Sequence, residues 1–271
     1  MSVPGAPFKN RTVAGIGDGA RDQFIRSEEV GEDARFRAVV LWLLQHVSDV
    51  PATDDWLSPA EREVLARLWA PKRIRDWRLG RWTGKRALAR GAAGALSEAD
   101  LASLARASIR AGESGSPRVF IDDREAEWAI SLSHAGEYGM CTVAQRPAAL
   151  GCDVESVGRR GEEFVVDWFT DTERRSVEAV APGDNRSRAI TLVWSAKESA
   201  LKALGVGLRL DTREVEVELS PDASDAGKWS PLVVCTSGRA LHGWWRADDE
   251  RVLTIVADPA PALPVALSRE P

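Results

Sequence analysis

Helix-forming and strand-forming segments of this chain come in blocks rather than one by one. Helical patterns occupy residues 58–104, and three strand-like runs follow between 127 and 156. The order then repeats, because a long helical pattern over 188–204 precedes four strand-like runs that end near 257. Blocks of helices followed by blocks of strands predict an α+β fold with mainly antiparallel sheets, not a parallel sheet of βαβ units. We therefore expect two similar α+β halves.

The chain of 271 residues is long enough for one large domain or for two similar halves. We assign residues 34–150 to an N-terminal half and 151–258 to a C-terminal half. Residues 1–33 mix glycine, proline and charges without a sustained period, which predicts a loose N-terminal extension. The proline-rich residues 259–271 are expected to form a mobile tail.

Capping patterns predict where several helices begin. Ser58 precedes a proline, and Glu61 follows three residues after Ser58, which is the capping-box pattern of a helix that starts at residue 59. Residues 72–90 predict a second, very basic helix. Thr170 and Glu173 form another capping box, so Glu173 has a structural explanation that competes with a catalytic one.

Composition and charge exclude several classes of protein. A hydrophobic content of 44%, a charged content of 28% and a net charge of -5 are typical of an ordinary globular protein. The longest apolar runs, such as 38–44, are too short to cross a bilayer, and residues 1–10 lack the apolar core of a signal peptide. A pI near 5.4 argues against a general nucleic-acid binder. We expect a cytoplasmic protein without a membrane or nucleic-acid partner.

Two acidic residues lie close together in the strand-like run 150–155. Asp153 and Glu155 are two positions apart, so in a strand they share one face with a separation of about 6.6 Å along the chain. They repel each other unless a cation or a basic group lies between them. Three interpretations remain open: a cation site, solvated acids at a strand end, or an Asp153–arginine pair.

The long helical pattern carries a second group of polar residues. Trp194, Glu198 and Lys202 are each four apart and share one stripe, while Lys197 lies on its flank. Periodicity alone favours a solvated pair between Glu198 and Lys202, with the lysine near the helix C-terminus. His134 ends a strand-like run at a turn that contains glycine, where it could donate to a phosphate.

Six segments together resemble a known family. GCDVE at 151–155, FTDTE at 169–173 and WSAKESALKALG at 194–205 resemble, in order and spacing, three motifs of 4'-phosphopantetheinyl transferases of the larger, surfactin-synthetase-activator type. These motifs are G-x-D-x-E, F-x-x-x-E and W-x-x-K-E-[AS]-x-x-K. The basic helix, the G-K-P segment and the S-H segment of the family resemble RDWRLGRWTGKRAL at 75–88, GSP at 115–117 and SLSHAG at 131–136. Ser116 stands where the family often has lysine.

The resemblance covers roughly residues 35–257 and implies a fold and a site. The fold would be a pseudo-dimer of two α+β halves with the site in the cleft between them. Mg²⁺ would be held by Asp153, Glu155 and Glu198 together with the pyrophosphate of coenzyme A, since magnesium prefers hard oxygen ligands. The residues implied to contact coenzyme A are Arg81, Lys85, Ser133, His134, Lys197 and Lys202, and those implied in catalysis are Glu155, Lys197, Glu198 and Lys202.

The function implied by the resemblance is transfer of 4'-phosphopantetheine from coenzyme A to a serine of a carrier protein. The partners would be acyl or peptidyl carrier domains of polyketide, nonribosomal-peptide or fatty-acid synthases, and the protein would act as a monomer. Two alternatives remain: a non-catalytic protein that binds coenzyme A or a carrier domain, and a magnesium-dependent hydrolase of the coenzyme A pyrophosphate. Retention of the three carboxylates argues against the first alternative.

Overall fold

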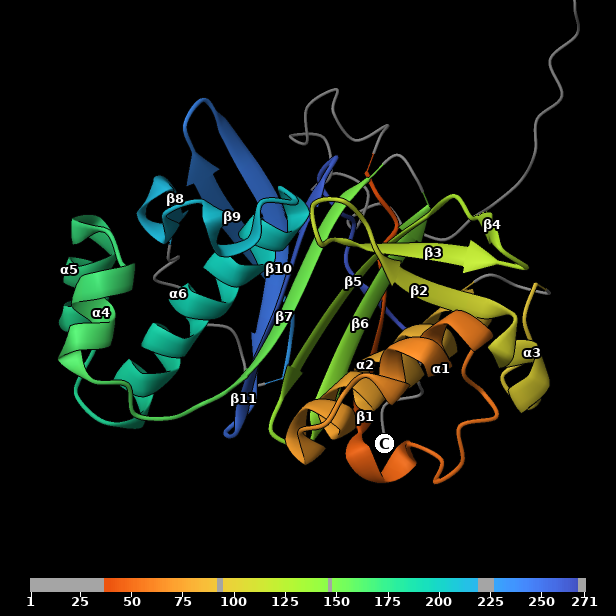
Figure 1. Ribbon diagram of the computed structural model, residues 1–271. Coiled ribbons are helices and arrows are strands. Elements are labelled where there is room, and N and C mark those ends of the chain that lie inside the picture. Colours follow the sequence, from red (N-terminus) through yellow and green to blue (C-terminus); the bar gives the residue numbers. More distant parts are fainter. Residues whose placement is uncertain (1–36, 92–94, 146–147, 219–226, 268–271) are drawn as a thin grey trace, which may run out of the picture. The chain divides into compact units, whose positions relative to one another are not determined.

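The computed structural model describes residues 37–91, 95–145, 148–218 and 227–267, which belong to one compact unit (Figure 1). The N-terminal extension expected over 1–33 lies outside the described residues, as do residues 268–271 of the expected tail. The expected boundary between residues 150 and 151 falls inside the compact unit and not at a linker. None of the helices in the described part of the chain combines the length and apolar character needed to cross a bilayer.

The elements follow the order that the sequence blocks predict. The first half contains β1 (Leu41–His46), η2 (Val47–Asp49), α1 (Pro59–Ala66), α2 (Pro71–Gly91), α3 (Leu101–Ala105), β2 (Ala107–Ala111), β3 (Pro117–Ile121), β4 (Arg124–Glu125), β5 (Trp128–Ala135) and β6 (Tyr138–Gln145). The second half contains β7 (Ala149–Ser156), α4 (Glu162–Trp168), α5 (Asp171–Ala179), α6 (Asp184–Ala203), η3 (Gly207–Arg209), η4 (Thr212–Glu214), β8 (Val215–Glu218), β9 (Ser230–Thr236), β10 (Arg239–Ala247) and β11 (Arg251–Asp258), followed by β12 (Val265–Ala266).

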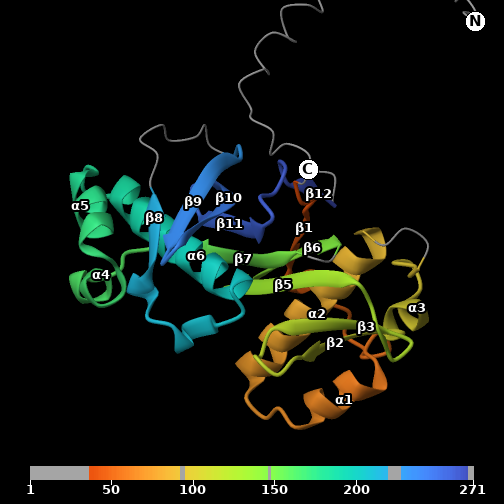
Figure 2. The same ribbon diagram turned by 90° about the horizontal axis from the view of Figure 1, so that it is seen from above.

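The strands form three sheets with the orders β12-β1-β6-β5, β7-β11-β10-β9-β8 and β2-β3-β4. Among the described residues, every strand pair is antiparallel except β12 with β1. The α+β class with mainly antiparallel sheets is therefore confirmed. The first strand of each half pairs with the last, since β1 lies beside β6 and β7 beside β11, and β5 runs next to β7 where the two halves meet (Figure 2). The two halves share this pairing of first and last strand, while the rest of their sheets differ.

Three parts of the fold differ from the sequence prediction. Three consecutive antiparallel strands were expected over 127–156, but β7 pairs with β11 rather than with β6. Helix α4 and the β2-β3-β4 sheet were not predicted. Residues 259–267 do not hang free, because β12 runs parallel to β1 and the backbone N–H of Leu267 donates to the carbonyl of Trp42 at 2.8 Å.

Both predicted capping boxes are confirmed. In α1 the backbone N–H of Glu61 donates to Ser58 Oγ at 3.3 Å, and the N–H of Ser58 donates to Glu61 Oε2 at 3.1 Å. In α5 the same reciprocal bonds join Thr170 and Glu173 at 3.2 and 2.8 Å. Each box satisfies two backbone N–H groups that a helix N-terminus would leave unpaired.

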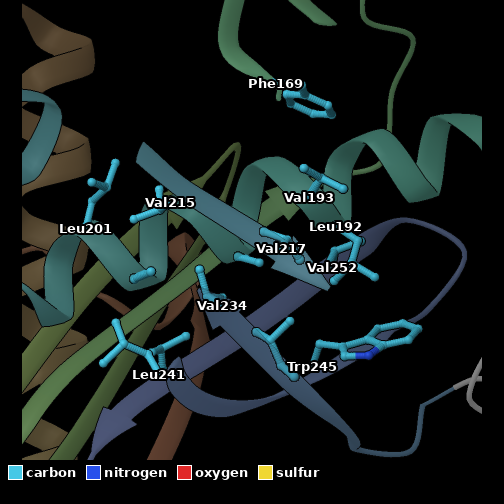
Figure 3. Close-up of a cluster of buried hydrophobic side chains, with 14 of the residues drawn as sticks. Phe169, Leu192, Val193, Leu201, Val215, Val217, Val234, Leu241, Trp245 and Val252 are labelled. Carbon is cyan, nitrogen blue, oxygen red and sulfur yellow. The ribbon is translucent and has the colours of Figure 1, made fainter. Parts of the chain in front are cut away.

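Buried apolar side chains form one cluster in each half and a third cluster between them. Helix α6 covers its own sheet with Val193 and Leu201, and these side chains meet Val217 and Val234 of the strands (Figure 3). The third cluster takes side chains from both halves: Val40, Trp42, Ala129, Met140, Ala144, Leu150, Cys152, Val154, Leu253, Ile255 and Ala257. The two halves therefore share one apolar cluster.

Candidate active site

A glycine allows β7 and α6 to approach each other closely. A Cβ atom on Gly151 would lie 1.8 Å from the carbonyl oxygen of Ser199 and 2.7 Å from the backbone nitrogen of Ala203. Both are backbone atoms and cannot move aside, so only glycine fits here. The close contact places the acidic end of β7 beside the face of α6 that carries Glu198 and Lys202.

Asp153 is the most buried acid of this group, with 4% of its surface exposed. Its Oδ1 accepts hydrogen bonds from Ser133 Oγ at 2.6 Å and from Lys202 Nζ at 2.8 Å. Lys202 also donates to the carbonyl of Cys152 at 3.1 Å. The other oxygen, Oδ2, is buried without a hydrogen-bond partner among the described residues. A buried carboxylate oxygen with no donor is costly, which indicates that an additional positive group or donor belongs there.

Glu155 has both carboxylate oxygens occupied. Oε1 accepts a hydrogen bond from Trp194 Nε1 at 3.0 Å, and Oε2 accepts one from Arg160 Nη2 at 2.9 Å. Burial raises the pKa of Glu155, and the nearby charge of Asp153 raises it further. Trp194 thus lies on the stripe that the sequence predicted, while Arg160 was missed.

Glu198 has Asp153, Glu155 and Lys202 as its charged neighbours and accepts no hydrogen bond from any described residue. Burial raises its pKa, Lys202 opposes that effect, and Asp153 and Glu155 add to it. The solvated Glu198–Lys202 pair that periodicity favoured is therefore not what the structure contains. Lys202 instead pairs with Asp153, and Glu198 remains close to two other carboxylates.

The donor chemistry of the three carboxylates fits a hard divalent cation. They repel one another, and the unpartnered Asp153 Oδ2 points to a missing positive group. No group of three His, Cys, Asp or Glu side chains within the described ranges is arranged as a ready metal site. The residues match Mg²⁺ in kind, but their oxygens are not assembled around a common point.

A cavity of about 380 Å³ opens beside Lys202 and is lined by segments of both halves. Its lining includes Arg81 of α2, Arg110 of β2 and Ser116, which belongs to the GSP segment. Arg209 Nη2 donates to the carbonyl of Ser114 at 3.1 Å and so connects the two halves at this place. The cavity presents cationic side chains and a polar loop, which suit an anionic ligand.

Ser133 and His134 lie at the end of β5, close to the acids. Ser133 donates to Asp153, as described above. His134 Nε2 lies 3.4 Å from Asp76 Oδ2, and Asp76 also pairs with Lys72 and Arg75. His134 is half exposed and remains available to a ligand from its open side.

Two lysines expected to contact coenzyme A are placed elsewhere. Lys197 is fully buried, pairs with Glu173 at 2.9 Å and donates to the carbonyls of Thr212 and Val215, so it faces the core and not the carboxylates. Lys85 is also fully buried, pairs with Glu61 at 2.6 Å and donates to two carbonyls. Neither ammonium group can reach a ligand in the cavity.

The second half also matches a protein family. A family model described as the 4'-phosphopantetheinyl transferase superfamily matches residues 149–256, from the start of β7 to within β11. The match is confined to this segment, which makes up about two fifths of the chain. The acids of β7 and the polar stripe of α6 both lie inside the matched range.

Curated relatives carry related names. The chain is 27% identical over 106 residues to the L-aminoadipate-semialdehyde dehydrogenase-phosphopantetheinyl transferase of Xenopus laevis. This alignment covers 36% of this chain and 35% of that protein. Identity is 30% over 93 residues with the 4'-phosphopantetheinyl transferase of Bacillus subtilis, with coverages of 34% and 40%. It is 42% over 55 residues with the holo-[acyl-carrier-protein] synthase of Chloroflexus aggregans, with coverages of 20% and 39%. The chain thus spans two fifths or less of the length of these relatives.

Among solved structures, the Chronobacterium ammoniagenes ACPS-CoA complex aligns with 41% of this chain and 98% of that chain. The TM-score is 0.31 at 21% sequence identity, a likeness that supports no inference about function.

Sequence reasoning missed two arginines of the site. Arg160 bonds Glu155, and Arg110 lines the cavity. Only six of the 36 basic residues are lysines, so an arginine at any one position carries little signal. Arg110 lies in β2, a strand that the sequence did not predict, so its position near the site could not be inferred either.

Proposed function

We propose that this protein transfers the 4'-phosphopantetheine arm of coenzyme A to a serine hydroxyl of an acyl or peptidyl carrier protein, with 3',5'-ADP as the leaving group. The observation that carries this proposal is the buried, half-satisfied carboxylate of Asp153 beside Lys202, at a cavity lined with arginines. The superfamily match and the names of the relatives support the reaction class.

Asp153, Glu155 and Glu198 are the residues that would hold Mg²⁺. Bound there, the ion would act as a Lewis acid toward the pyrophosphate of coenzyme A and offset the charge that develops during transfer. Rearrangement of Arg160 would free one oxygen of Glu155 for this role, because Arg160 now occupies Oε2.

Lys202 is the cation best placed to act on the phosphates. Its ammonium group is anchored by Asp153 Oδ1 and by the carbonyl of Cys152, and the residue also lines the cavity. A fixed positive charge that needs no reorganisation stabilises negative charge on the leaving oxygen more effectively than a mobile one. Arg81 and Arg110 are the candidates for the nucleotide end of the substrate.

Glu198 is the better candidate for the group that accepts the serine proton. Glu155 is held by Trp194 and Arg160, whereas Glu198 accepts no hydrogen bond from the described residues. A proton passed to Glu198, directly or through water, leaves the serine oxygen free to attack the β-phosphorus.

The second substrate is a protein, so part of the surface must receive a carrier helix. Carriers of polyketide, nonribosomal-peptide and fatty-acid synthases are the expected partners, and a monomer suffices for the reaction. Acidic carriers would be steered by arginines near the site despite the net charge of -5.

The test is intact-mass spectrometry of an apo carrier protein after incubation with this protein, coenzyme A and Mg²⁺. We expect the carrier to gain one phosphopantetheine, and we expect EDTA to abolish that gain. Asp153→Asn serves as the inactive variant, and Glu163→Gln, an exposed acid of α4, serves as its matched control. We expect the first substitution to lower the rate by at least about 100-fold and the second to leave it unchanged.

Other outcomes would redirect the proposal. Binding of coenzyme A without a mass gain on any of several carriers would favour the non-catalytic alternative. Release of 3',5'-ADP in the absence of a carrier would favour the hydrolase. Full activity of a folded Asp153→Asn variant would refute the role given to the carboxylates.

A further inference from the structure

The two halves contain the same buried ion pair in the same setting. Glu173 follows Glu61 by 112 positions, and Lys197 follows Lys85 by the same interval. Each glutamate is the third residue of a helix that opens with a capping box, and each pairs with a fully buried lysine of the next long helix, at 2.6 Å in the first half and 2.9 Å in the second.

The remaining contacts of the two glutamates also correspond. Glu61 accepts a hydrogen bond from the backbone N–H of Ile109 in β2 at 3.0 Å, and Glu173 accepts one from Val217 in β8 at 2.7 Å. Each carboxylate therefore ties a helix N-terminus, a long helix and an edge strand together. Because both halves contain this arrangement, we assign it a structural role.

Among the described residues, only the first half adds a third charge to the pair at ion-pair distance. Arg81 Nε lies 3.7 Å from Glu61 Oε1, whereas the residue 112 positions later is Val193, which is buried in the apolar cluster of its half. The pair in the second half joins one acid to one lysine. The set in the first half joins one acid to two cations and so carries an excess positive charge.

That second cation lies where it can meet a ligand. Arg81 lines the cavity beside Lys202, its guanidinium lies 4.9 Å from the centre of the Trp77 ring, and 18% of its side chain is exposed. Its Nε is buried and has no hydrogen-bond partner in the described part of the chain. The ion pair with Glu61 and the stacking on Trp77 are therefore what hold the guanidinium in place.

We propose that Glu61 is a positioning residue for substrate binding, which holds the Arg81 guanidinium at the cavity so that it receives a phosphate group of the nucleotide substrate. This inference rests on the proposed function, since that function supplies the nucleotide. Lys85 and the backbone N–H groups of Ser58 and Ile109 fix the Glu61 carboxylate, and Glu61 in turn fixes Arg81. A preorganised cation binds an anion without paying the cost of ordering a free side chain.

The second half provides the matched control for the experiment. Glu61→Gln and Glu173→Gln remove the same charge from equivalent pairs, so both should lower the melting temperature to a similar extent. The probe is 3',5'-ADP, and its dissociation constant is measured by calorimetry at a temperature where both variants remain folded. We expect Glu61→Gln to weaken binding by at least about tenfold and Glu173→Gln to change it by less than about threefold.

A second background separates positioning from a general loss of structure. Arg81→Met should weaken binding on its own, and adding Glu61→Gln to Arg81→Met should then have no further effect, because Glu61 acts through Arg81. If Glu61→Gln does not fold, the double variant Glu61→Met with Lys85→Met replaces the buried pair by apolar side chains of similar volume and should show the same loss.

Three results would overturn the inference. They are normal binding by Glu61→Gln, equal loss in Glu61→Gln and Glu173→Gln, and full additivity of Glu61→Gln with Arg81→Met. In each case a wild type that still modifies a carrier leaves the proposed function intact. A wild type that neither binds 3',5'-ADP nor modifies a carrier overturns both.

Discussion

At the scale of single residues, the candidate site brings several carboxylates together in a buried or partly buried environment. Burial raises the pKa of both Glu155 and Glu198, the charge of Asp153 raises both further, and the charge of Glu155 adds to the effect on Glu198. An acid whose pKa is raised by folding stabilises the folded state when it is protonated, and that contribution is lost as the pH rises through the raised pKa. Ionised Glu155 and Glu198 therefore lower the free energy of unfolding at neutral pH. This is what we expect of carboxylates arranged to bind a cation.

Glu198→Gln tests this reasoning because the amide resembles the protonated acid. In EDTA at pH 7.5 we expect the variant to melt on the order of 2–4 °C above the wild type. The difference should vanish below pH 4.5, the ordinary pKa of the group, where the wild-type carboxyl is protonated in both states. Added Mg²⁺ should raise the melting temperature of the wild type more than that of the variant.

Thermal melts at both pH values, followed by circular dichroism, measure these shifts, with Glu163→Gln as the exposed control. A Glu198→Gln variant that melts below the wild type at pH 7.5 in EDTA would contradict the assignment of a strained, desolvated charge. Equal stabilisation of wild type and variant by Mg²⁺ would contradict the role of Glu198 as a ligand.

Residue types and spacing predicted part of the site. The sequence placed Asp153 and Glu155 on one face and put Glu198 and Lys202 on one stripe, and the structure brings these together. It could not distinguish Lys197 from Lys202, because the burial of a helical residue depends on which side of the helix the sheet covers. The carbonyls that bind Lys197 belong to Thr212 and Val215, and helical periodicity alone does not show which side of α6 they cover.

At the scale of elements, the site depends on how closely α6 can lie on β7. Gly151→Ala would place a methyl group against the backbone of Ser199 and Ala203 and push the helix away from the strand. We expect a loss of at least about 2 kcal/mol of unfolding free energy together with loss of transfer, measured by denaturant titration. Gly158→Ala is the matched control, since a Cβ there meets nothing within 4 Å.

If Gly151→Ala keeps the stability of the wild type, the contact between β7 and α6 can relax. The close approach of the two elements would then not require a glycine. The two capping boxes were the best predicted features of the fold, because a capping box involves only residues that are close together in the sequence. Strand pairing was predicted less well. The choice of β11 rather than β6 as the partner of β7 depends on contacts between segments about 100 residues apart in the sequence.

At the scale of the whole molecule, the two halves are joined by more than the candidate site. The third apolar cluster draws Trp42 and Met140 from the first half and Cys152 and Ile255 from the second, so neither half can bury its surface alone. Separation of the halves would expose this cluster to water at a cost of roughly 25 cal/mol for each Å² of apolar surface. The repeated element order visible in the sequence predicted two halves, but nothing local in the sequence predicted that they share a core.

A shared core predicts cooperative unfolding. Calorimetry of the full chain should show one transition for the two halves, with a ratio of calorimetric to van't Hoff enthalpy near 1. Leu104→Ala, in the cluster of the first half, and Leu192→Ala, in that of the second, should each cost about 2–5 kcal/mol and move the whole transition to lower temperature. A transition that splits in either variant would show that each half is stable by itself, and the candidate site would then lie between two separately folding domains rather than inside one cooperative structure.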